Sequence, residues 1–403
     1  MNPPLSFERR YRAPYASTAL CVFAVMLVVA AFTGQWPLQA NYYNSYVLQA
    51  CAWLEGRLDL GQDYDWLELA IVNGKYYVSF PPFPSYVMLP FAVFFRYATP
   101  DGVIAWAVTL LGVLYALRLY ELLRRDGRAA FWVLFLYLGT GYLFISMNGY
   151  VWFIAQTMCF TLSLMAMVHA MQGQGCAALT LWACAVGCRP MAAFYLPVLL
   201  WLLWQDKGTL TLPQWIARRW YWPLPALLIA GSYMLLNQAR FGNPFEFGHT
   251  YLPEFLRAQN GQFSLRYVKD NLLLLFRLPV QDAPNDHLIF FSEQTMAFWL
   301  INPMYFCIAA AWVYGLLRRR GFPALVMLPI IAAAHLLLIC SHRTLGGWQF
   351  GNRYLLDMMP WLFMGFLMWM PEDDRFACWS VPLIGWGATI NIIGTVATYR
   401  YWI

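Results

Sequence analysis

The chain has 403 residues, of which 61% are hydrophobic and 11% are charged, and its mean hydropathy is +0.50. Soluble globular proteins carry about 25% charged residues, so this composition excludes that class. The formal net charge of +6 at pH 7 comes mostly from short arginine clusters between apolar stretches, which argues against a nucleic-acid partner.

Apolar blocks close to the ~20 residues that cross a bilayer recur along the whole chain. They lie at 16–33, 102–120, 129–147, 151–171, 176–188, 190–204, 221–237, 296–317, 322–341, 354–370 and 378–398. Because backbone groups in lipid must be hydrogen-bonded within their own segment, each block is predicted to be a helix. The sequence therefore predicts an all-α integral membrane protein, with about 11 transmembrane helices in one polytopic domain over residues 1–403. The short blocks 176–188 and 190–204 form either two helices hinged at Arg189-Pro190 or one long broken helix.

Basic residues predict how these helices are oriented. Arginines precede the first block and fill short turns between later blocks, at 9–12, 124–128, 218–219 and 318–320. Short cytoplasmic loops are enriched in Lys and Arg, so we expect all four clusters on the cytoplasmic side. Residues 34–101 then form a first external loop and residues 239–295 a second, and 342–352 is also external.

The apolar segment 82–96 has to stay on the external side for this orientation to hold. We expect a re-entrant or surface-lying helix there, broken by Pro84 and Pro90. The large first external loop would then contain helices that lie on the membrane surface. If 82–96 crossed the bilayer instead, the arginines at 124–128 would face outside, which the charge rule disfavours.

The first external loop combines carboxylates with aromatic rings and turn residues. It contains the acidic residues Glu55, Asp59, Asp63, Asp65 and Glu68, followed by the run Asn73-Gly74-Lys75-Tyr76-Tyr77. A protein that merely spans the bilayer has no need of a large acidic loop, whereas an enzyme that works at the membrane surface does. The aromatic residues of this loop suit the faces of sugars, and they equally suit an interfacial aromatic belt.

Cationic side chains are expected beside these acids on the external side. They are Lys75, Arg189, His342, Arg343 and Arg353. Ionisable residues within or next to membrane spans are costly, so they mark candidate functional positions. For Arg353 a structural ion pair is the alternative, because Asp357 follows at the i, i+4 spacing of one helical face.

Carboxylates next to cations suit a substrate with a phosphate leaving group and a nucleophilic acceptor. The cations would neutralise the charge that develops on the leaving phosphate. One carboxylate would take the acceptor proton as general base, or would hold a divalent metal such as Mg²⁺ or Mn²⁺. Sugars carried on polyprenyl phosphate have this charge distribution, with an apolar tail for the bilayer.

Three stretches of the chain resemble a known family. They run from Asn41 to Leu60, from Glu68 to Pro84 and from Gly347 to Pro360. With the large loop after the first span, they resemble the GT-C glycosyltransferases, in particular bacterial members similar to the protein mannosyltransferase and aminoarabinose transferase group. The resemblance implies a GT-C-like fold in a bacterial inner or plasma membrane, with the active face on the non-cytoplasmic side. It also implies inverting transfer of a sugar from a polyprenyl-phosphate-linked donor to a glycan, lipid or protein acceptor.

The chain departs from the family directly after the first span, where the family usually has an acid. Here this place holds Asn41 and Asn44. An amide cannot act as a general base at neutral pH, although it can orient a hydroxyl or ligate a metal. We therefore expect Glu68 to be the catalytic carboxylate, with Asp63 and Asp65 as the next candidates. The predicted substrate-binding residues are Asn41, Asn44, Lys75, Tyr76, Tyr77, Arg189, His342, Arg343 and Arg353.

Two other functions stay open at the level of sequence. A polytopic transporter or lipid flippase would have two related halves with acids near the bilayer midplane, whereas the acids here concentrate in external loops. A non-catalytic GT-C-like protein would bind a lipid-linked glycan and present it to a partner. Asn41 in place of an acid is compatible with that second alternative.

Overall fold

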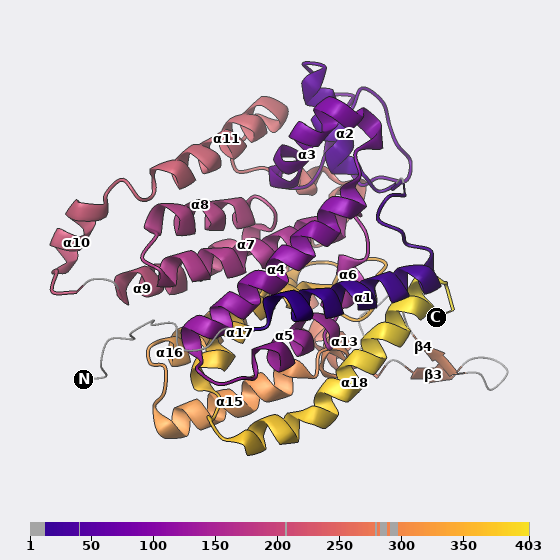
Figure 1. Cartoon of the computed structure of the whole chain (residues 1–403). Coiled ribbons are helices and arrows are strands. Elements are labelled where there is room, and N and C mark those ends of the chain that lie inside the picture. Colours follow the sequence, from indigo (N-terminus) through magenta and orange to yellow (C-terminus); the bar gives the residue numbers. More distant parts are fainter. Residues whose placement is uncertain are drawn as a thin grey trace. The chain divides into compact units, whose positions relative to one another are not determined.

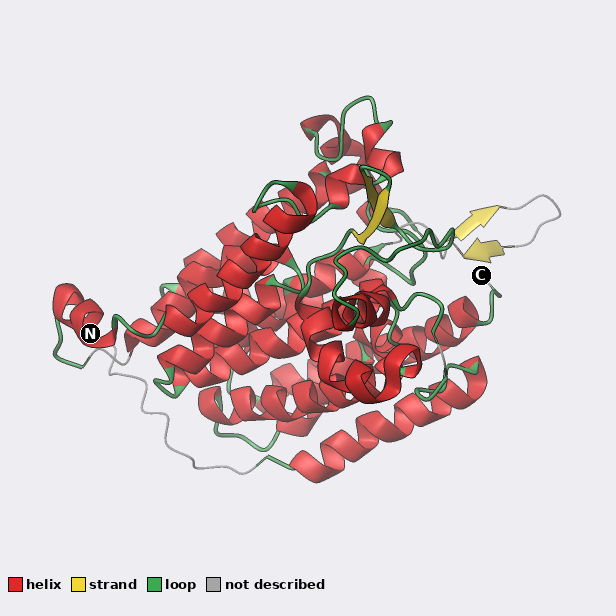
Figure 2. Cartoon of the chain, turned by 90° about the horizontal axis from the view of Figure 1, so that it is seen from above, coloured by secondary structure: helices red, strands yellow, loops and turns green. Residues whose placement is uncertain are grey.

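The computed structural model describes residues 13–39, 41–205, 208–278, 280–282, 288–290 and 297–402. Helices dominate it, and the strands within these ranges form two short antiparallel hairpins (Figure 2). The predicted all-α class is therefore confirmed. The predicted cytoplasmic residues Arg9, Arg10 and Arg12 lie outside the described ranges.

The chain forms two compact units, each assembled from separate stretches of sequence. The first unit comprises residues 1–35, 110–147 and 263–403, and the second unit comprises residues 36–109 and 148–262. The long helix α4 (Asp101–Leu123) begins in the second unit and ends in the first.

The first unit has a helix at its centre that is buried along almost its whole length. This helix is α17 (Met359–Trp369), and it contacts α15 and α16. The other elements of this unit are α1 (Tyr15–Thr33), α5 (Ala129–Leu138), α6 (Tyr142–Ser146), η5 (Leu265–Tyr267), α13 (Val268–Phe276), β3 (Val280–Asp282), β4 (Leu288–Phe290), α14 (Phe298–Ile301), α15 (Met304–Arg318), α16 (Ala324–Ser341), η6 (Arg353–Asp357) and α18 (Asp374–Tyr399).

The second unit packs α8 (Gly175–Val186) between α7 (Val151–Met171) and α11 (Leu224–Phe241), as Figure 1 shows. Glycines at both ends of α8 permit the close approach, because a Cβ at Gly175 or Gly187 would lie within 2.2 Å of a side-chain atom of Trp222 or Tyr233. The remaining elements are α2 (Ser45–Leu54), β1 (Leu69–Val72), β2 (Lys75–Val78), α3 (Phe83–Phe95), η1 (Arg96–Ala98), η2 (Pro190–Tyr195), α9 (Leu196–Trp204), α10 (Leu212–Arg219), η4 (His249–Tyr251) and α12 (Pro253–Leu256).

The predicted apolar blocks all contain helices. Among the described residues, five helices are long and apolar enough to cross a membrane, namely α1, α4, α7, α16 and α18. Shorter apolar helical segments are α5, α8, η2 with α9, α15 and α17, and α11 occupies the block predicted at 221–237. The polytopic architecture is thus confirmed. The blocks 176–188 and 190–204 form two separate helices, not one broken helix.

The prediction that prolines break the segment 82–96 is wrong, because α3 is one continuous helix. Pro84 lies in the first turn of α3, where the missing N–H would have had no helical partner. Pro90 is accommodated inside the helix. At 1.5 Å per residue α3 is about 20 Å long, which is shorter than the ~30 Å hydrocarbon core.

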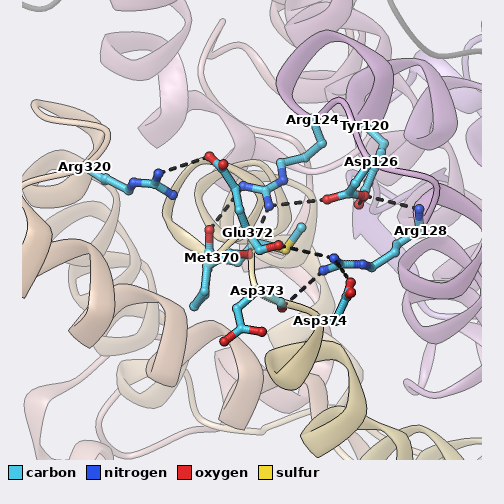
Figure 3. Close-up of polar contacts among 10 residues, drawn as sticks. Tyr120, Arg124, Asp126, Arg128, Arg320, Met370, Glu372, Asp373 and Asp374 are labelled. Carbon is cyan, nitrogen blue, oxygen red and sulfur yellow. Dashed lines mark hydrogen bonds and ion pairs between the residues drawn. The ribbon is translucent and has the colours of Figure 1, made fainter.

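Arginines of the first unit meet the turn between α17 and α18 (Figure 3). Arg124 donates hydrogen bonds to the carbonyl oxygens of Met370 at 3.1 Å and of Pro371 at 3.0 Å. Its guanidinium also lies 3.4 Å from the Asp126 carboxylate. Arg124 thereby connects the end of α4 to the turn before α18.

Two further arginines reach the same turn. Arg128 forms an ion pair with Asp374, and Arg320 forms one with Glu372 at 3.0 Å (Figure 3). We call Arg124, Asp126, Arg128, Arg320, Glu372 and Asp374 the arginine cluster. The cluster joins the two arginine-rich turns at 124–128 and 318–320, which are predicted to be cytoplasmic, to residues 372–374.

Candidate active site

A tight hairpin positions the acidic part of the predicted first external loop. β1 and β2 pair antiparallel from Leu69 opposite Val78 to Val72 opposite Lys75. Asn73 and Gly74 form the turn, and both have positive φ, which these two residue types tolerate best. At the open end of the hairpin, the Ser79 hydroxyl donates to the Glu68 carbonyl at 2.7 Å. Glu68 therefore has a fixed backbone position directly before β1.

The Glu68 side chain is exposed and oriented by an indole. Nε1 of Trp152 donates to Oε2 of Glu68 at 3.1 Å. Trp152 lies in the first turn of α7, next to Val151, whose N–H donates to the Tyr43 carbonyl at 2.9 Å. Glu68, the first candidate for the catalytic carboxylate, is thus oriented by a hydrogen bond from the first turn of the buried helix α7.

Asn41, which stands where the family has an acid, uses both ends of its amide. Nδ2 donates to Oδ2 of Asp101 at 2.9 Å, and Oδ1 accepts from the N–H of Tyr43 at 2.8 Å. Asn44 lies at the N-terminus of α2, and its carbonyl accepts from the N–H groups of the first helical turn. The two amides therefore shape the loop that leads into α2.

Asp63 and Asp65, the other candidate acids, are exposed in the turn before Glu68. Oδ1 of Asp63 accepts from the N–H of Tyr64 at 2.9 Å. Within the part of the chain that the structure describes, neither aspartate forms an ion pair. The turn thus presents its carboxylates to the solvent.

Lys75, Tyr76 and Tyr77 have three different environments in β2. The exposed Lys75 ammonium lies 3.8 Å from the Asp59 carboxylate. Tyr76 is half-buried, and its carbonyl accepts from the N–H of Leu60 at 2.8 Å. Tyr77 is buried, with its ring 5.5 Å from that of Phe241. Lys75 and Tyr76 are therefore the more accessible of the three.

The remaining predicted cations lie in different units. Arg189 of the second unit is half-buried between α8 and η2. In the first unit, the buried His342 ring packs edge to face against the Phe263 ring, with centroids 5.0 Å apart. Arg343, the next residue, is exposed. Arg353 is buried at the start of η6, where its guanidinium lies 4.7 Å from the ring of Tyr354.

Sequence reasoning missed two buried ionisable residues of the second unit. Asp101, the partner of Asn41, is only 3% exposed, and a Cβ at Gly149 would come within 2.6 Å of its carboxylate carbon. Arg240 is 4% exposed and donates to the Val78 carbonyl at 3.1 Å and to Oδ1 of Asn237 at 2.9 Å. The available signal is their position, since Asp101 directly precedes the apolar block at 102–120 and Arg240 lies three residues after the block at 221–237.

The exposed acid Glu55 illustrates how charge is balanced elsewhere in the loop. Its carboxylate bonds the Arg57 guanidinium and accepts from the Tyr97 hydroxyl at 3.1 Å. The hydrogen bond from Arg57, followed by that from Tyr97, lowers the pKa of Glu55 below its ordinary value. Burial and the same hydrogen bond raise the pKa of Tyr97.

The described residues contain no cluster of three or more metal-binding side chains for the predicted divalent metal. Among the described residues, no three His, Cys, Asp or Glu side chains are grouped so that they could hold a metal ion. Mg²⁺ is commonly held by one or two carboxylates together with waters and substrate phosphates, so the divalent metal stays a prediction.

Comparison with known proteins identifies the fold. No family model and no curated protein matches the chain. The crystal structure of ArnT from Cupriavidus metallidurans bound to undecaprenyl phosphate matches with a TM-score of 0.54 and 14% identity, over 95% of this chain and 76% of that one. ArnT from the same organism in the apo state matches with a TM-score of 0.52 and 13% identity, over the same shares. The chain therefore has the polytopic fold of ArnT, as the GT-C resemblance implied.

Proposed function

We propose that the protein is a membrane glycosyltransferase that moves a sugar from a polyprenyl-phosphate donor to an acceptor on the non-cytoplasmic face. The observation that carries this proposal is the exposed Glu68 carboxylate, which Trp152 orients in a chain with the ArnT fold. The ArnT crystal structure contains undecaprenyl phosphate, which supports a lipid of that class as the donor carrier.

Glu68 would act as the general base of a single displacement. The acceptor hydroxyl oxygen attacks the anomeric carbon and forms the new glycosidic bond, while Glu68 takes the hydroxyl proton. The bond between the anomeric carbon and the phosphate oxygen breaks, and polyprenyl phosphate leaves with its electron pair. The configuration at the anomeric carbon is inverted. General-base catalysis of this kind contributes about 10²- to 10⁴-fold to a rate.

The leaving phosphate would be neutralised by cations. Within the second unit, Lys75 is the exposed candidate and Arg189 is the half-buried one. Charge-assisted hydrogen bonds to phosphate strengthen as negative charge develops on the leaving oxygen, so these side chains favour the transition state over the ground state. Asn41 and Asp101 would support this site indirectly by holding the loop that leads into α2.

The test uses the purified full chain in proteoliposomes with a panel of radiolabelled undecaprenyl-phosphate hexoses and pentoses. Glycan, lipid and peptide acceptors are supplied in parallel, and labelled product and released undecaprenyl phosphate are measured together. The proposal predicts equal amounts of both for at least one donor and acceptor pair. Donor that crosses the bilayer intact indicates a flippase, and donor that binds without bond cleavage indicates a non-catalytic binding protein. Either result in place of transfer overturns the proposal.

A further inference from the structure

Two exposed aromatic side chains of the second unit contact each other in the loop that contains Glu68. Trp66, two residues before Glu68, is 51% exposed, and Tyr42 is 78% exposed. Nε1 of Trp66 donates to the Tyr42 carbonyl at 3.0 Å, and the two rings meet edge to face with centroids 6.5 Å apart. The hydrogen bond fixes the Trp66 indole although about half of the residue is exposed.

A second group of rings lies beside the Glu68 carboxylate. The half-buried Tyr43 ring is 5.0 Å from the ring of Trp152 and 5.1 Å from that of Tyr150. Trp152 bonds Glu68 directly, and Tyr43 follows Tyr42 in the chain. Trp152 thus contacts the Glu68 carboxylate, and Trp66 lies two residues before Glu68 in the chain. We call Tyr42, Tyr43, Trp66, Tyr150 and Trp152 the aromatic platform.

The charge around the platform selects among possible ligands. Asp63, Asp65 and Glu68 flank Trp66, and neither aspartate has a cationic partner within the described residues. A saccharide that carries carboxylates of its own would be repelled there. An interfacial aromatic belt would place Asp63 and Asp65 against the anionic headgroups of the surrounding lipids, so the belt accounts poorly for this region.

Rings next to carboxylates match the two surfaces of a sugar. The C–H face of a pyranose packs on an aromatic ring, and its hydroxyls donate to carboxylate oxygens. Rings that hydrogen bonds already hold in place lose little conformational freedom when a ligand stacks on them. An uncharged or amine-bearing sugar also avoids repulsion by the three acids.

We propose that the aromatic platform binds the ring of an uncharged or amine-bearing saccharide, with Trp66 as its main stacking surface and Glu68 as its hydroxyl acceptor. This inference rests on the proposed function, which requires one sugar on the donor and allows another on the acceptor. The platform has the chemistry to hold either of them.

Binding without turnover gives the first test. The full chain in detergent is titrated with neutral trisaccharides of glucose, galactose and mannose, with a glucosamine trisaccharide and with trigalacturonic acid, and heat is measured. We expect binding of a neutral or amino trisaccharide and at least tenfold weaker binding of trigalacturonic acid. In Trp66→Ala the affinity should fall roughly tenfold, and Trp66→Phe should retain most of it. Trp220→Ala is the matched control, since Trp220 is 64% exposed in the same unit.

Kinetics distinguish the two sources of the sugar and separate this inference from the proposed function. If the protein transfers sugar, a raised KM of Trp66→Ala for the acceptor assigns the platform to the acceptor, and a raised KM for the donor assigns it to the donor. Unchanged KM values for both substrates, with transfer intact, overturn the platform and leave the function standing. Loss of trisaccharide binding in Trp66→Ala, in a protein that transfers no sugar, supports the platform and overturns the function. Equal binding of trigalacturonic acid and neutral trisaccharides, or equal loss in Trp220→Ala, also overturns the platform.

Discussion

The arginine cluster of the first unit and the aromatic platform of the second unit use charge in opposite ways. In the arginine cluster, each carboxylate meets a guanidinium, and Arg124 also bonds two carbonyl oxygens (Figure 3). Around the platform, Glu68 bonds an indole, and Asp63 and Asp65 lie exposed. Carboxylates that are neutralised by arginines connect turns, whereas the Asp63 and Asp65 carboxylates, which have no cationic partner within the described residues, face the solvent and are available to a ligand. Substitutions should therefore cost stability in the first region and function in the second.

The largest change in stability is expected for Arg124→Ala. This substitution leaves the carbonyls of Met370 and Pro371 without their donor and removes the cation beside Asp126. The cost should be about 2–4 kcal/mol of unfolding free energy, because buried groups lose their partners. The thermal unfolding midpoint in detergent measures it. Arg218→Ala, at an exposed arginine in the last turn of α10, serves as control and should shift the midpoint much less. Equal shifts for both variants would mean that the cluster does not connect these turns.

An intermediate loss of stability is expected when Asp101 is replaced. These substitutions test whether the second unit also contains a carboxylate that stabilises the fold. Asp101→Ala removes the acceptor of the Asn41 amide and should cost about 1–3 kcal/mol. Asp101→Asn keeps an oxygen that can accept this bond, so it should retain most of the stability. Thermal unfolding of both variants provides the measurement. The anchoring role fails if the alanine variant is as stable as the wild type.

The smallest effect concerns pH and the exposed Glu55. Because its folded-state pKa is lowered, Glu55 contributes stability above the ordinary carboxyl value of 4.5, and this contribution disappears as the pH falls through the lowered pKa. The thermal midpoint of Glu55→Gln should thus lie slightly below that of the wild type at pH 7, and the two should converge as the medium becomes more acidic. A gap that stays constant down to acidic pH would show that the bonds to Arg57 and Tyr97 do not perturb Glu55.

The helices could be predicted from the sequence because each depends on a local property. An apolar block of sufficient length predicts α1 or α7 whatever the rest of the chain does. The continuity of α3 does not follow from proline's general tendency to break helices, because Pro84 lies in the first turn, where proline is tolerated.

The contacts of the site could not be predicted, because they join residues far apart in the chain. Glu68 was identified from its place before the hairpin, but its indole partner Trp152 begins a helix that the sequence shows only as apolar. Asp101 reads as an acidic residue at a helix N-terminus, where such residues are common, and nothing local links it to Asn41. Tertiary packing decides these pairs.

The proposed function depends on the Glu68 carboxylate acting as the general base of sugar transfer. The most direct measurement is the single-turnover rate at which Glu68→Gln releases undecaprenyl phosphate from a labelled donor, expressed per folded molecule. We expect a rate about 10²- to 10⁴-fold below the wild type, with an unchanged thermal unfolding midpoint, because an amide cannot take the acceptor proton. A wild-type rate in Glu68→Gln would contradict the claim.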